Sequence, residues 1–192
     1  MKGRDAKMTR SAKQRIDGMC KLYHIDIEGA YKQGKFILET YQDLSWKTAR
    51  EANYVREDLM SYCSVDMDQA LVYLLTFATD ERRDFFESKI DALFTSHTMG
   101  GMIESAAAWV RDYPTEGNLY YNIIYLRYLC RDRLRESELL EVLDMERSTY
   151  YKRRKEAVTV FGVAIHEMIR RRKVELDANR QEAMLHPLDA VS

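Results

Sequence analysis

Residues 137–165 have the sequence SELLEVLDMERSTYYKRRKEAVTVFGVAI, and this stretch decides the fold. We predict a short helix over about residues 136–143, which buries Leu139, Leu140 and Leu143, followed by a break at residues 144–146. A longer helix is predicted to begin near Arg147 or Ser148. Its apolar residues recur at helical spacing and are Tyr150, Ala157, Val158, Phe161 and Ile165. Two helices joined by a short turn are therefore expected here.

The other face of the longer helix is polar and cationic. It carries Thr149, Tyr151, Lys152, Arg153 and Lys155. Small polar and aromatic residues at the start of a helix can enter a major groove, where base edges are accessible. Cations one turn further along can reach the flanking phosphates, which adds affinity without sequence preference. The pattern predicts binding to double-stranded DNA, although a solvated face in an ordinary helical bundle is the alternative.

This stretch resembles region 4 of sigma factors, and more closely the phage-type transcriptional regulators of the ArpU/RinA kind. The resemblance covers about residues 119–165 and rests on SELLEVLDM, on STYYKRRKEA and on the Phe161-Gly162 that follows. It implies a C-terminal helix-turn-helix that binds promoter DNA and acts on transcription, in some members with contact to RNA polymerase. With the cationic face, the predicted DNA-binding residues are Arg147, Ser148, Thr149, Tyr151, Lys152, Arg153 and Lys155.

Two positions depart from the family pattern. The turn position that usually holds Gly is Asp144, which also tolerates a left-handed backbone. The usual Ser cap is replaced by Glu146, so that Ser148 is an alternative cap. The start of the longer helix is thereby left open by two residues.

Composition favours an all-α, multi-helix bundle. Among 192 residues, 46% are hydrophobic and 32% are charged, while 8 Gly and 2 Pro are too few for the turns of an all-β domain. Cys20, Cys63 and Cys130 form no CxxC pair, and we expect buried, reduced thiols. Neither a signal peptide nor a membrane-length apolar run is present. We expect a cytoplasmic protein without membrane contact, metal or cofactor.

Charge is concentrated in two basic segments on an acidic body. Residues 1–21 carry seven Lys/Arg and two Asp, a net charge of +5, and residues 147–173 carry nine Lys/Arg and two Glu, a net charge of +7. The first segment, which contains Lys2, Arg4, Lys7, Arg10, Lys13 and Arg15, is either an arm lying along DNA or a solvated tail. Residues 170–173 either contact phosphates or favour a helix C-terminus.

Helix start signals and one proline set the expected organisation. Helices are predicted to start after Ser45, Asp66, Thr79 or Asp80, Thr98 and Thr115. Pro114 suggests a boundary between an N-terminal region, 1–113, and a DNA-binding region, 115–173, with a polar tail over 174–192. The two regions either stand apart or share one core. No internal repeat is expected.

Several functions fit these observations. The favoured one is a sequence-specific DNA-binding regulator, whose N-terminal region serves dimerisation or polymerase contact. Alternatives are a sigma-like factor bound to core RNA polymerase, a protein-interaction adaptor that never binds DNA, and a phage packaging subunit. No GxSxG, P-loop or GxGxxG motif is present, and the histidines do not group, so an enzyme is not expected.

Overall fold

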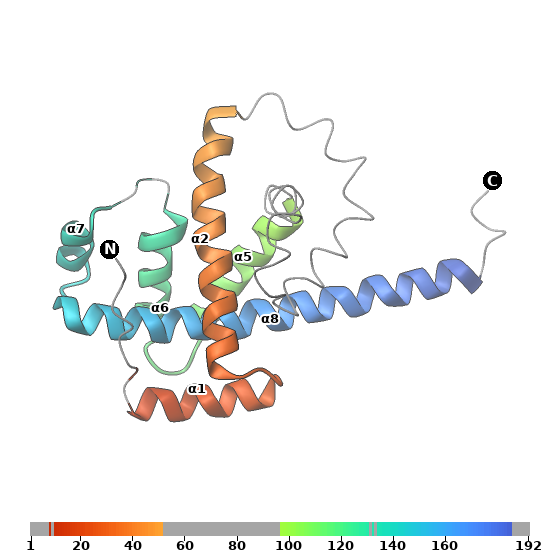
Figure 1. The fold of residues 1–192 in the computed structure, drawn as a ribbon, viewed down its shortest axis with the longest axis horizontal. Helices are drawn as coiled ribbons and strands as arrows, with labels where there is room; N and C mark the ends of the chain where they lie inside the picture. Colours follow the sequence, from red (N-terminus) through yellow and green to blue (C-terminus); the bar gives the residue numbers. More distant parts are fainter. Residues whose placement is uncertain (1–7, 9, 52–96, 131, 133, 186–192) are drawn as a thin grey trace, which may run out of the picture.

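Helix α8 (Arg147–Leu185) is the axis on which most of the other helices pack in this computed structural model (Figure 1). The structure describes all residues except 1–7, 9, 52–96, 131, 133 and 186–192. Within this part of the chain the regular elements are all helical, which confirms the all-α class. The other elements are α1 (Arg10–Leu22), α2 (Ile27–Glu51), α5 (His97–Arg111), α6 (Gly117–Ile124), the π-helix η2 (Tyr125–Leu129) and α7 (Glu136–Val142).

The middle of α8 is buried on every side. All residues from Glu156 to Ile165 are buried, because α1, α2, α5 and α6 each contact this helix. The predicted inward stripe, Tyr150, Ala157, Val158, Phe161 and Ile165, is confirmed as part of the core. Full burial of an aromatic or branched apolar side chain is worth about 1.5–3 kcal/mol. This stripe therefore fixes the position of α8, including its N-terminal turns.

Helix α2 crosses α8 at unusually small residues. Ala30 and Gly34 of α2 lie against Val158 and Gly162 of α8. A Cβ atom on Gly162 would overlap the carbonyl oxygen of Ala30, and one on Gly34 would press on the carbonyl oxygen of Val158. The two backbones can approach this closely only because both glycines lack a side chain. The crossing holds the N-terminal half of α2 against α8.

The π-helix η2 directly follows α6. The amide of Cys130 donates to the carbonyl of Tyr125 at 2.7 Å, five residues back, which defines η2. The wider turn leaves the carbonyl of Arg127 to accept a hydrogen bond from the Gln42 side chain at 2.8 Å. Helix α2 thus supports the segment that leads into α7.

The two predicted regions share one hydrophobic core. Pro114 lies in the turn between α5 and α6, yet one buried cluster contains residues from both sides of it, such as Ile16, Ile37, Ile103 and Phe161. The proline therefore ends a helix without separating two cores.

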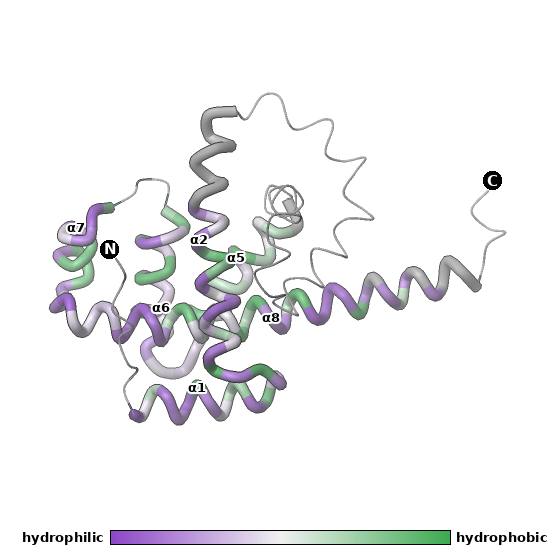
Figure 2. Tube along the Cα trace, viewed as in Figure 1, coloured by the Kyte–Doolittle hydropathy of each residue, from purple (hydrophilic) through white to green (hydrophobic). Residues whose placement is uncertain are grey.

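The predicted helix limits are partly correct. Starts near Thr98 and Thr115 correspond to α5 and α6, but the start after Ser45 is wrong because α2 runs through that residue. The helices predicted after Asp66 and after Thr79 or Asp80 lie outside the described residues. Helix α8 continues through the predicted tail to Leu185, and Figure 2 shows this distal half as mainly hydrophilic.

The basic N-terminal segment is helical from Arg10 onward. Residues Arg10–Leu22 form α1, which buries Ala12, Ile16 and Cys20 against the core. An arm or solvated tail is therefore the wrong description for Arg10, Lys13 and Arg15. Lys2, Arg4 and Lys7 lie outside the described residues.

Candidate nucleic-acid interface

Helices α7 and α8 meet at a tight turn formed by residues 143–146. The amide of Asp144 donates to the carbonyl of Glu141 at 3.1 Å, and the amide of Met145 donates to that of Leu140 at 3.0 Å. Asp144 has a φ of 49°, the left-handed conformation expected from the sequence. Helix α8 begins at Arg147, so its start, which the sequence left open by two residues, is fixed. We call residues 136–155 the α7–α8 corner.

Buried side chains anchor this corner to the core. Leu139 of α7 and Tyr150 of α8 are almost completely buried, while Leu140, Leu143 and Met145 are half-buried against the core cluster. The turn therefore cannot change its angle without exposing apolar surface. As a result, the first turns of α8 are held in a fixed direction at one end of the molecule (Figure 1).

Three of the predicted DNA-binding residues lie open to solvent on the first turns of α8. Ser148, Thr149 and Lys152 are exposed, and no hydrogen bond or ion pair engages their side chains within the described part of the chain. Their hydroxyl and ammonium groups are suited to base edges and phosphate oxygens. These residues present the accessible front of the corner.

Arg147 is exposed and Tyr151 is half-buried, and both contact the same carboxylate, that of Glu136. The Arg147 guanidinium pairs with the Glu136 carboxylate at 2.7 Å, and the Tyr151 hydroxyl donates to the same carboxylate at 2.9 Å. The Tyr151 hydroxyl and the negative charge of Glu136 raise the pKa of Arg147. Glu136 belongs to the first turn of α7, so this cluster bridges the two helices of the corner.

Arg154 was missed by the sequence analysis. Its guanidinium carbon lies 4.8 Å from the Tyr151 ring centroid and 5.9 Å from that of Tyr150, both within cation–π range. The cation is half-buried on aromatic rings rather than exposed on a long, mobile side chain. The signal was visible in the Tyr150-Tyr151 pair that precedes a run of four cations, Lys152–Lys155.

Lys155 lies over a tyrosine of another helix. Its ammonium nitrogen is 4.7 Å from the ring centroid of Tyr31 in α2, and its side chain is half-buried. This contact joins the cationic face of α8 to the first turns of α2. No pattern in the sequence indicated that α2 would border the corner.

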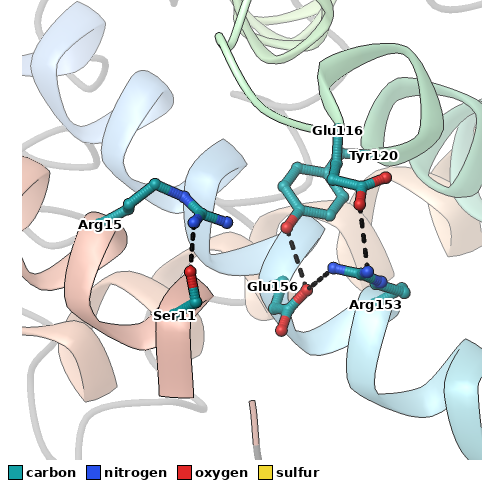
Figure 3. Close-up of polar contacts among 6 residues, drawn as sticks. All are labelled: Ser11, Arg15, Glu116, Tyr120, Arg153 and Glu156. Atoms are coloured by element: carbon teal, nitrogen blue, oxygen red, sulfur yellow. Dashed lines mark hydrogen bonds and ion pairs between the residues drawn. The ribbon is translucent and has the colours of Figure 1, made fainter. Parts of the chain in front are cut away.

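Arg153 points into the body of the protein. Figure 3 shows its guanidinium between Glu156 and Glu116, at 3.0 Å and 3.1 Å, and its side chain is 23% exposed. Tyr120 donates to the buried Glu156 carboxylate at 3.0 Å, and its pKa is raised by burial and by that carboxylate, so the hydroxyl stays a donor. On the α1 side of Figure 3, Arg15 donates to Ser11. Arg153 thus neutralises a buried carboxylate and does not join the exposed face.

The three arginines at 170–172 are paired with carboxylates of α8 itself. Arg170 and Arg171 both contact Glu167 at 2.7 Å, and their hydrogen bonds and charges lower the pKa of Glu167 to about 2. Arg172 contacts Glu175 at 3.1 Å. Since α8 continues to Leu185, the interpretation of this run as a helix C-terminus is wrong.

No protein-family model, curated protein or solved structure matches this chain. The resemblance to phage-type regulators therefore stays a prediction. Among the described residues, no helix has the length and apolar character that spanning a membrane requires.

Proposed function

We propose that the chain is a double-stranded DNA-binding transcriptional regulator that inserts the first turns of α8 into a major groove. The observation that carries this proposal is the arrangement of the α7–α8 corner. Ser148, Thr149 and Lys152 stand exposed at the front, on a helix whose direction is fixed by buried Leu139 and Tyr150. A rigid helix with short polar side chains at its tip suits readout of base edges.

Cations behind this tip support phosphate contact. Lys155 and Arg154 are held on tyrosine rings, which restricts their side chains before any ligand arrives. Preordered cations lose less conformational entropy on binding. The regulatory role of the DNA complex, and its assignment to a phage or prophage setting, rest on the resemblance of residues 119–165 alone.

The proposal predicts a change in salt dependence when α8 loses its cations. Lys152→Ala combined with Lys155→Ala should weaken binding to every duplex and reduce the slope of log K against log salt by about 1–2 units, since each lost phosphate contact removes about 0.9. Fluorescence anisotropy with a labelled duplex, repeated over a salt series, measures this slope.

A charge-matched variant provides the control. Arg171→Ala with Arg172→Ala removes the same charge from α8, about 24 Å along the axis from Lys155 at about 1.5 Å per residue. Its slope should stay close to that of the wild-type protein. Equal losses in the two variants, or no loss in the first, would contradict binding through this corner.

A further inference from the structure

Helices α1 and α2 meet at a turn that has the same backbone conformation as the turn between α7 and α8. His24 has a φ of 56°, as Asp144 has 49°. The amide of His24 donates to Lys21 at 3.3 Å, and that of Ile25 donates to Cys20 at 3.0 Å, which repeats the bonds at Asp144 and Met145. We call residues 16–35 the α1–α2 corner.

Three residues after the turn also match. Counted from the left-handed residue, Tyr31, Lys32 and Lys35 of α2 occupy the positions that Tyr151, Lys152 and Lys155 occupy in α8. Lys32 and Lys35 have side chains that are 59% and 44% exposed. Both helices thus present a tyrosine and two lysines on their first turns.

The two lysine-bearing segments are in contact. Lys155 of α8 lies over the ring of Tyr31, and Lys35 follows Tyr31 by one helical turn on the same side of α2. The cationic face of α8 therefore continues onto α2 through this ring. Cations on two adjoining helices can meet neighbouring phosphates along one DNA strand.

Carboxylates on α2 reduce the positive charge of this surface but leave its lysines available to a ligand. Lys32 lies 3.9 Å from Glu28, and Lys35 lies 3.9 Å from Glu39, each four residues away on the same helix. Pairs of this length between exposed side chains contribute only a few tenths of a kcal/mol. A phosphate can therefore replace the Glu28 or the Glu39 carboxylate at little cost.

We propose that the Tyr31–Lys35 segment of α2 is a second phosphate-contacting element, which binds the backbone of the same duplex that α8 enters. The segment contributes affinity and orientation without base readout. Glu28 and Gly29 stand where α8 has Ser148 and Thr149, so α2 lacks the paired hydroxyls of the α8 tip. This inference rests on the proposed function of the α7–α8 corner.

The test compares two double variants of the full chain on a labelled duplex of about 30 base pairs, close to three turns of B-DNA. Lys32→Ala with Lys35→Ala should reduce the salt slope by up to about 1.8, from two lost phosphate contacts at about 0.9 each. Affinity for a random duplex and for a duplex enriched by in vitro selection should fall by the same factor. Arg171→Ala with Arg172→Ala, which has the same net charge, should leave the slope near the wild-type value.

The possible results distinguish this inference from the proposed function on which it rests. If the wild-type chain binds duplex DNA through Lys152 and Lys155, but the α2 variant behaves like its charge-matched control, the second element is disproved and the α8 interface stands. If the wild-type chain does not bind duplex DNA, both proposals fail. A smaller loss on the random duplex than on the selected one would also overturn it, since it would assign base readout to α2. Thermal melting monitored by circular dichroism should show both variants folded, because all four substituted side chains are at least 41% exposed.

Discussion

The α1–α2 corner and the α7–α8 corner share a backbone turn and a Tyr-Lys-x-x-Lys sequence, but they differ in what surrounds these residues. In α7, Glu136 is exposed and binds Arg147 and Tyr151. At the matching position of α1 stands Ile16, which is fully buried. The α1–α2 corner is therefore packed into the core through α1. In the α7–α8 corner, the corresponding side of α7 faces solvent.

The same contrast appears on the following helices. Gly34 of α2 lies against the backbone of α8. The equivalent residue of α8 is Arg154, a cation that lies over the ring of Tyr151. The turn is determined by its left-handed residue and its buried anchors, and both corners satisfy these conditions. Suitability for DNA is determined by a few side chains that the turn leaves exposed. A helix-turn-helix backbone is thus insufficient evidence for DNA readout.

The largest effect is expected from breaking the crossing that brings the two corners together. Gly162→Ala places a Cβ atom on the carbonyl oxygen of Ala30, so α2 and α8 must separate. Overpacking of this kind costs about 1–3 kcal/mol of unfolding free energy. Urea unfolding monitored by circular dichroism measures the loss, which should be accompanied by weaker DNA binding as Tyr31 leaves Lys155.

Gly101→Ala is the control for this variant. Nothing lies within 4 Å of a Cβ atom at Gly101 in α5, so the substitution should be neutral or stabilise by about 0.5–1 kcal/mol. A Gly162→Ala protein as stable as the wild type would show that the two helices are not in close contact.

A second prediction tests whether the two turns are equivalent. His24→Val and Asp144→Val each force a β-branched residue into a left-handed conformation, which costs about 1–2 kcal/mol. Because the hydrogen bonds around both residues match, the two losses should be similar when measured by urea unfolding. His24→Gly and Asp144→Gly, which suit this conformation, should retain stability. A clear loss at one turn only would disprove their equivalence.

The sequence predicted the α7–α8 corner well, because its signals are local. Leu139 lies on the apolar side of the first helix, and Tyr150 and Phe161 lie on the apolar side of the second. Asp144 between them is a residue that tolerates a left-handed backbone. Periodicity failed for Arg153, because its partners are a buried carboxylate on its own helix and Glu116, far away in the sequence. A helical wheel cannot show that a cation has a buried partner.

Sequence patterns also did not predict three features that depend on more distant parts of the chain. The distal half of α8 is mainly hydrophilic, so no continuous apolar stripe indicated that the helix continues to Leu185. The charge of α1 concealed its small buried face of Ala12, Ile16 and Cys20. The match of Tyr31 and Lys35 to Tyr151 and Lys155 was present in the sequence, but only the shared turn geometry makes these positions equivalent.

The smallest effect is expected at Glu136, the residue that most clearly distinguishes the two corners. Its carboxylate pairs with Arg147 at 2.7 Å and accepts a hydrogen bond from Tyr151, so in the proposed complex we expect it to compete with a phosphate for this cation. Glu136→Gln should free Arg147 for one further phosphate contact and steepen the salt slope by about 0.9. Anisotropy titrations over a salt series measure the change, and affinity for random duplexes should rise most at low salt.

Two comparisons separate the release of Arg147 from a general gain in positive charge. Glu141→Gln removes one negative charge from the same short helix, where Glu141 is exposed, and it should change the slope far less. Arg147→Ala should have little effect in the wild type but should cancel the gain in the Glu136→Gln background, because only the freed arginine can contribute. If Arg147→Ala lowers the slope equally in both backgrounds, Arg147 binds phosphate despite Glu136. The contrast between the corners would then depend on the hydroxyls at the tip of α8 rather than on the carboxylate behind them.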